Sequence, residues 1–193
     1  MIARADRTVS EKLVSVTHFD QLGRVRLTRQ IENASDCPSG AQCAETAGIK
    51  VQARYRSTTG HNYTLVSNPY RSANAVDTAN GSTMGWTRTD HDPAGRAVEV
   101  KTFGGSSLPA PWASGGGENT NATGTVSTVH DGPFTTIFEQ VANARCNESD
   151  GLGRLVRVVE NPQTSGTPPP CTQGSGGYTT RSEERRVGKE CRL

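Results

Sequence analysis

The sequence predicts an all-β protein built from serial antiparallel β-hairpins. First, its 193 residues include 21 Gly and 10 Pro, and only 32% belong to the hydrophobic set, which argues against a helical bundle and for a thin core. Second, the motif D-x-x-G-R followed by an aliphatic residue occurs three times. Third, the segments after these motifs alternate apolar and polar residues with the period of two that is typical of strands.

The repeated motif predicts a particular backbone conformation. Asp is favoured at the first position of a type I turn, where its carboxylate accepts hydrogen bonds from N–H groups further along the chain. Gly is favoured at the fourth position, where it adopts a positive φ and forms a G1 bulge. Each motif is therefore predicted to form the corner of a β-hairpin. The corner residues are Asp20, Gly23 and Arg24; Asp92, Gly95 and Arg96; and Asp150, Gly153 and Arg154.

Strands are expected on both sides of the first corner. Residues 25–31 follow it and place Val25, Leu27 and Ile31 on one face, with polar residues on the other. Residues 14–17 precede it with the same alternation, so the two arms are expected to pair.

The second and third corners have similar flanks. Trp86 lies in the strand that enters the second corner, and after it Val98 and Val100 alternate with Glu99 and Lys101. After the third corner, two valines alternate with an arginine. Each hairpin is thus expected to have one apolar face and one polar face that contacts water. Because a two-stranded hairpin is only marginally stable by itself in water, its apolar face must be covered by neighbouring hairpins. Two further hairpins are expected, from residues 49–56 with 63–67 and from residues 124–130 with 134–138.

Two stretches, residues 104–117 and 161–177, are rich in Gly, Pro and Ser and are interpreted as loops inserted between hairpins. Residues 1–180 then form one continuous repeat segment. Residues 181–193 differ sharply in composition and resemble the in-frame translation of a sequencing-library adapter, so we set them aside as a non-native tail and expect the chain to be a fragment.

Charge and hydropathy exclude two classes of partner. Without the tail, basic and acidic residues are equal in number, so the apparent net charge of +2 gives no support for binding to nucleic acid. No apolar stretch approaches the length of about 20 residues that a membrane span requires.

Four cysteines remain outside the tail: Cys37, Cys43, Cys146 and Cys171. Four cysteines allow three pairings. Cys37 and Cys43 flank a short turn, and Cys146 and Cys171 lie on either side of a predicted hairpin, which favours those two pairs. Disulfides or free thiols are preferred to a zinc site, because the spacings are wide and no His is close. Disulfides would indicate an oxidising compartment.

The three corners and their alternating strands resemble the YD repeats of the Rhs family, in which an aromatic-Asp pair begins the turn, Gly-Arg ends it and an alternating strand follows. In this sequence the aromatic place is filled by Phe19, His91 and Ser149. The most typical string starts at Ser149 and runs through Asp150, Gly153 and Arg154 to Val158. The resemblance implies a β-strand spiral that winds into a hollow shell.

In that family the shell commonly encloses a C-terminal toxin or another cargo domain of a secreted or surface-attached bacterial protein. The resemblance therefore implies a non-catalytic structural segment without cofactor, whose partners are neighbouring repeats and a cargo domain of the same chain. Such a fragment should have open strand edges at both ends.

Two alternatives use other residues. A surface adhesin would bind carbohydrate by stacking sugars on aromatic side chains, namely Trp86, Trp112, Tyr55, Tyr63 and Tyr70. A hydrolase would use one of the four histidines, but the sequence has no G-x-S-x-G nucleophile elbow, and this alternative ranks last.

Overall fold

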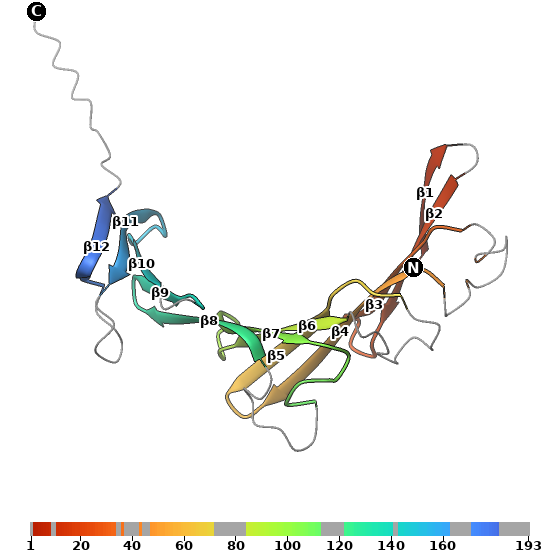
Figure 1. The fold of residues 1–193 in the computed structure, drawn as a ribbon, viewed down its shortest axis with the longest axis horizontal. Coiled ribbons are helices and arrows are strands. Elements are labelled where there is room, and N and C mark those ends of the chain that lie inside the picture. The colour runs from red at the N-terminus through yellow and green to blue at the C-terminus, as the bar shows by residue number, and fades with distance from the viewer. Residues whose placement is uncertain are drawn as a thin grey trace, which may run out of the picture. The chain divides into compact units, whose positions relative to one another are not determined.

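Figure 1 shows the fold in a computed structural model, which describes residues 2–8, 11–33, 36, 43, 47–71, 84–112, 122–140, 143–162 and 171–181. Within these residues the predicted all-β class is confirmed: there are twelve strands, and each lies next to the strand that precedes it in the chain. Contacts within the chain define two compact units, Met1–Thr125 and Val126–Leu193. None of the described segments is a helix long and apolar enough to span a membrane.

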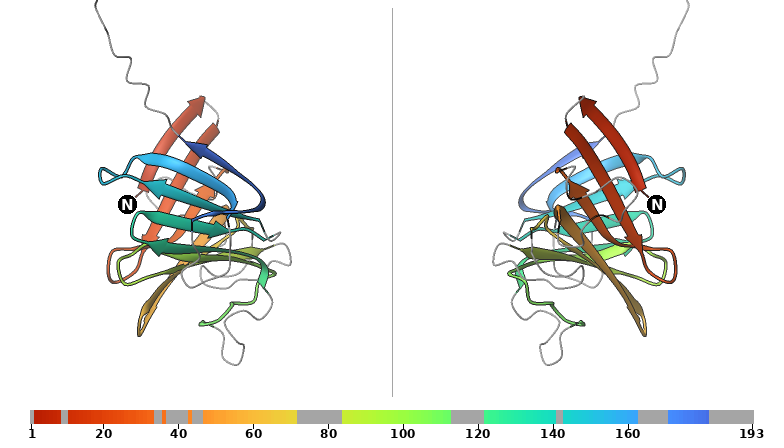
Figure 2. Two further views of the ribbon diagram at one scale, coloured as in Figure 1. Left: turned by 90° about the vertical axis from the view of Figure 1, so that its left-hand side faces the viewer. Right: turned by 90° about the vertical axis from the view of Figure 1, so that its right-hand side faces the viewer.

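Unit 1 is an antiparallel meander, in which each strand from the second onward pairs with the strand before it (Figure 2). Most of these pairs are β-hairpins. Its strands are β1 (Ile2–Thr8), β2 (Glu11–Phe19), β3 (Val25–Ile31), β4 (Ile49–Thr58), β5 (His61–Ser67), β6 (Gly85–His91) and β7 (Ala97–Gly104).

Unit 2 continues the same pattern, with antiparallel pairs from β8 to β12. The unit boundary falls within β8. The strands are β8 (Ala122–Asp131), β9 (Phe134–Phe138), β10 (Ala144–Ser149), β11 (Leu155–Pro162) and β12 (Gln173–Arg181).

The prediction of a loop over residues 161–177 is wrong at both ends, because β11 extends to Pro162 and β12 starts at Gln173. The glycines of β12 explain the error. A Cβ at Gly174 would lie 2.6 Å from the Asn161 carbonyl oxygen, and one at Gly177 would lie 2.5 Å from that of Glu160. The glycines thus allow the β12 backbone to lie close to the β11 backbone. Because glycine has no side chain, this strand shows no alternation of apolar and polar residues in the sequence.

The other predicted boundaries shift less. The loop predicted over 104–117 begins one residue late in the structure, because Gly104 ends β7, and residues 113–117 lie outside the described residues. β12 includes Arg181, the first residue of the predicted tail, and residues 182–193 lie outside the described part of the chain.

The core of unit 1 lies on one face of the sheet. Leu27 and Ile31 are fully buried there as predicted, whereas Val25 is 37% exposed at the corner. The largest buried apolar cluster is formed by β5, β6, β7 and the segments beside them, and consists of Leu65, Tyr70, Met84, Trp86 and Phe103.

The prediction that Glu99 and Lys101 lie on a wet face is wrong. The β6–β7 register pairs Trp86 with Phe103 and Arg88 with Lys101, which places these side chains on the same face. Lys101 is only 2% exposed, and its ammonium group binds the Glu99 carboxylate. Lys101 therefore takes part in the core of unit 1, where it is paired with an acidic residue.

Arg88 is the most fully enclosed of these charges. Its guanidinium donates two hydrogen bonds to the Asp90 carboxylate, at 2.7 and 2.8 Å, and a third to the Ala110 carbonyl oxygen at 2.7 Å. The rings of Tyr63 and Phe103 lie 5.4 and 5.8 Å from its Cζ atom. This geometry satisfies the buried charge and also ties the segment after β7 to the sheet.

Unit 2 has a smaller core that depends on a disulfide. Cys146 and Cys171 are bonded to each other, and both pack with Val159 and the partly buried Phe134. The bond connects Cys146 in β10 to Cys171, which lies two residues before the start of β12. Cys43 is also disulfide-bonded, but Cys37, its predicted partner, lies outside the described residues, so that pairing stays a prediction.

Loss of the Cys146–Cys171 bond is expected to destabilise unit 2 selectively. The bond closes a loop with a sequence separation of 25, for which chain entropy predicts a cost of about 3–4 kcal/mol. Hydrogen exchange after Cys146→Ser and Cys171→Ser substitution should show faster exchange in β10–β12. Amides of β5–β7 in unit 1 serve as the internal control, and an equal change in both units would contradict this account.

Candidate functional site

The first D-x-x-G-R corner connects β2 to β3 and is closed by the Asp20 side chain. Asp20 Oδ1 accepts hydrogen bonds from the N–H groups of Leu22 and Arg24, both at 2.9 Å. Its Oδ2 accepts two more from the Arg24 guanidinium, at 2.8 and 2.7 Å. The backbone adds two bonds, from Gly23 N–H to Asp20 O and from Asp20 N–H to Arg24 O. One carboxylate thus holds the whole turn.

The second corner repeats this arrangement between β6 and β7. Arg96 N–H donates to Asp92 Oδ1 at 2.9 Å, and Arg96 Nε donates to Oδ2 at 2.8 Å. Gly95 N–H donates to Asp92 O, and Asp92 N–H donates to Arg96 O, both at 2.9 Å.

The third corner, between β10 and β11, has the same bonds. Leu152 and Arg154 donate their N–H groups to Asp150 Oδ1 at 2.9 Å, and Arg154 Nε donates to Oδ2 at 2.7 Å. The Gly153 and Asp150 N–H groups close the backbone ring as in the other two corners. The motif therefore encodes one local structure three times.

Glycine is needed at the fourth position because its φ is positive. The φ angles are 75° at Gly23, 81° at Gly95 and 78° at Gly153. This confirms the turn geometry predicted from the motif. The strand register also shifts beside each corner, between His18 and Phe19, between Asp90 and His91, and between Glu148 and Ser149.

The carboxylates of the corners are held in their charged form. For Asp92 and Asp150 the backbone N–H groups of Arg96 and Arg154 are the largest cause, and both pKa values lie below the ordinary 3.8. For Asp20 burial raises the pKa, but the hydrogen bonds from Arg24 and Leu22 together outweigh it, so this pKa is lowered too.

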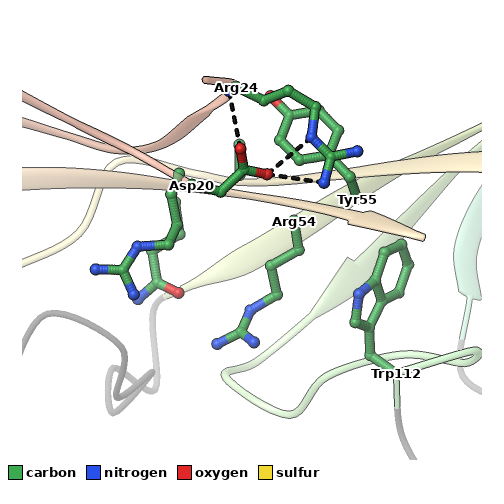
Figure 3. Close-up of a pocket in the computed structure, with 8 residues that line it drawn as sticks. Asp20, Arg24, Arg54, Tyr55 and Trp112 are labelled. Carbon is green, nitrogen blue, oxygen red and sulfur yellow. Dashed lines mark hydrogen bonds and ion pairs between the residues drawn. The ribbon is translucent and has the colours of Figure 1, made fainter. Parts of the chain in front are cut away.

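The three corners differ in what lies beside them. In the first, the Arg24 guanidinium lies over the Tyr55 ring, 4.4 Å from its centroid, and the Tyr55 hydroxyl donates to Val25 O at 3.0 Å. Next to this contact is a cavity of about 290 Å³, whose lining includes Arg54 and Trp112 (Figure 3). Sequence reasoning missed this cavity, because it joins residues up to 92 positions apart.

The aromatic residues of the adhesin alternative do not form one surface. Trp86, Tyr63 and Tyr70 are 1–4% exposed and belong to the interior of unit 1, so they cannot stack on a sugar. Only Tyr55 and Trp112 are partly exposed, and both line the cavity.

Two of the four histidines of the hydrolase alternative have contacts with a carbonyl or a hydroxyl oxygen. His91 Nδ1 lies 3.2 Å from Asn62 O, and His130 Nδ1 lies 3.5 Å from the Thr135 hydroxyl. In the described part of the chain, no group of three His, Cys, Asp or Glu side chains is arranged to hold a metal ion.

Comparison of the chain with protein-family models, with curated proteins and with solved structures finds no match. Function is therefore inferred from the corners and the strand order.

The third corner offers a matched test of the glycine requirement. Gly153→Ala should destabilise the protein by roughly 1–2 kcal/mol, because alanine is strained at positive φ although no atom lies within 4 Å of the new Cβ. Gly151, in the same turn, has equal space and no positive φ. Gly151→Ala should therefore leave the unfolding free energy unchanged or raise it, and equal losses for the two variants in chemical denaturation would contradict this account.

The lowered pKa values predict a specific acid sensitivity. Because the folded pKa of each corner Asp lies below its unfolded value, the carboxylates stabilise the fold above about pH 4, and this contribution disappears as pH falls through the folded values. Asp20→Asn, Asp92→Asn and Asp150→Asn combined should flatten the loss of stability between about pH 5 and pH 2.

Thermal unfolding across this pH range is the measurement, and Asp131→Asn, in a hairpin turn without the motif, is the control. An unchanged acid profile in the triple variant would show that the corner carboxylates do not contribute.

Proposed function

We propose that this chain is a non-catalytic wall segment of an Rhs-type β-shell, which encloses or presents a C-terminal toxin or other cargo in a secreted or surface bacterial protein. The single observation that carries the proposal is the threefold recurrence of one corner geometry along a meander in which each strand adds to the previous one. Such an assembly grows by repetition and needs no other element to determine its strand order.

The ends of the strand order support the same function. Among the described strands, β1 pairs only with β2 and β12 pairs only with β11. Each therefore has one edge whose backbone groups can pair with a further repeat. Open edges are a liability in a finished domain but are required in a segment that continues on both sides.

The buried side chains of unit 1 also support a structural role. Trp86 and Arg88 are almost fully buried, and they donate hydrogen bonds to Ser106 O and Ala110 O in the segment after β7, so they hold a segment that lies over the sheet. The Cys146–Cys171 disulfide is consistent with an exported protein, since such bonds persist in oxidising compartments.

The proposal predicts the composition of the uninterrupted gene. Long-read sequencing across the locus should show further D-x-x-G-R corners and then a compositionally distinct cargo domain downstream. A stop codon soon after Tyr178, with no further corners on either side, would contradict enclosure of a cargo.

A further inference from the structure

The last strand of unit 2 contributes little to the core of that unit. β12 pairs with β11 through four consecutive residues, Tyr178 to Arg181, and the register then shifts before one more pair, between Pro162 and Gln173. The side chains from Tyr178 to Arg181 are all exposed, and three of the four residues before them are glycines. β12 therefore buries little apolar surface and depends on its backbone pairing with β11.

The disulfide supplies the attachment that these side chains do not. The core cluster of unit 2 consists of Cys146, Val159 and Cys171, with Phe134 packed against it, and it contains no described side chain of β12. Cys146 lies opposite Val159 in the β10–β11 pair, and Cys171 lies two residues before β12 starts. The bond thus connects the start of β12 to β10, the strand on the far side of β11.

β10 and β11 have further attachments to each other. They pair at five positions, and the third corner closes their hairpin through the bonds between Asp150 and Arg154. In addition, Arg157 Nε donates to Glu148 Oε2 at 2.6 Å across the pair. None of these printed bonds involves β12, so they remain in place when the disulfide is broken.

We propose that the Cys146–Cys171 disulfide is a redox latch for β12: reduction by a dithiol releases this strand and leaves β10 and β11 paired. With the bond intact, the start of β12 cannot move away from β10, which favours pairing along β11. Without it, β12 is an edge strand held by its backbone hydrogen bonds, and such strands are among the first to open.

The reduction takes place by thiol–disulfide exchange. A thiolate of the dithiol attacks Sγ of Cys171, which is 7% exposed, whereas Cys146 is fully buried. The S–S bond breaks, and Cys146 leaves as a thiolate and takes up a proton. The second thiol of the reductant then attacks the mixed disulfide, which frees Cys171 as a thiol. Two electrons pass to the two protein sulfurs, and the dithiol becomes a disulfide.

The latch has a consequence for the wall segment proposed above, and this step alone rests on that proposed function. In an oxidising compartment β12 is in place and offers its outer edge to the next repeat. In a reducing compartment the sheet ends at β11, so the next repeat is not adjacent to its partner strand. The wall beyond β12 therefore assembles only after export.

Hydrogen exchange of the whole chain, with and without dithiothreitol, provides the test. Reduction should speed the exchange of β12 amides by about 100-fold or more, which corresponds to the constraint that a loop of this length provides. Amides of β10 and β11 should change by about tenfold or less, and the Gly153 N–H, which donates to Asp150 O in the third corner, should remain protected. Reoxidation with glutathione disulfide should restore the protection of β12.

The double variant Cys146→Ser and Cys171→Ser is the matched control. Its β12 amides should exchange fast under both conditions, and dithiothreitol should have no further effect on them. This control also separates the latch from the disulfide of Cys43 in unit 1, which the same reagent reduces. Alkylation followed by mass spectrometry counts the reduced thiols in each sample.

Three results would overturn the latch. They are protection of β12 that persists after reduction, loss of protection in β10 and β11 to the same degree as in β12, and a bond that dithiothreitol does not reduce in the native chain. A gene without further repeats would instead remove the shell function and leave the latch intact, so the two failures are distinguishable.

Discussion

The structure depends on one local interaction, the Asp carboxylate that accepts hydrogen bonds from the backbone and the Arg side chain of its own turn. In the first corner Asp20 holds Arg24 by backbone and side chain, and Gly23 supplies the positive φ that lets the chain reverse. All partners lie within five consecutive residues. The hydrogen bonds that close the turn are therefore local, and the turn determines which two strands meet and in which register.

The strands between the corners are stabilised by buried ion pairs and a disulfide in addition to apolar packing. A chain with only 32% hydrophobic residues has little apolar surface to bury. Unit 1 compensates by placing paired charges in its interior, with Arg88 enclosed by Asp90 and two aromatic rings. Unit 2 instead uses the Cys146–Cys171 bond. Neither solution creates a large self-contained core, which agrees with a proposed role as part of a longer repeat array.

The features that could be predicted from the sequence are those encoded locally. The three corners and the strands at residues 25–31 and 134–138 follow from turn chemistry and alternation, and the structure confirms them. The inward direction of Lys101 depends on its cross-strand partner Arg88, and the extent of β12 depends on glycines that leave no pattern. The cavity requires Trp112 to approach β4, a contact between distant residues that no local motif reports.

Amide hydrogen exchange of the corners, measured residue by residue by NMR, tests the central claim most directly. The Gly23, Gly95 and Gly153 N–H groups each donate to the carbonyl oxygen of the Asp that begins their turn. We expect all three to be protected to the same degree as the flanking strand amides. Exchange at the rate of an unstructured peptide in these glycines, with protected strands on either side, would show that the corners are not held by the Asp-centred turn.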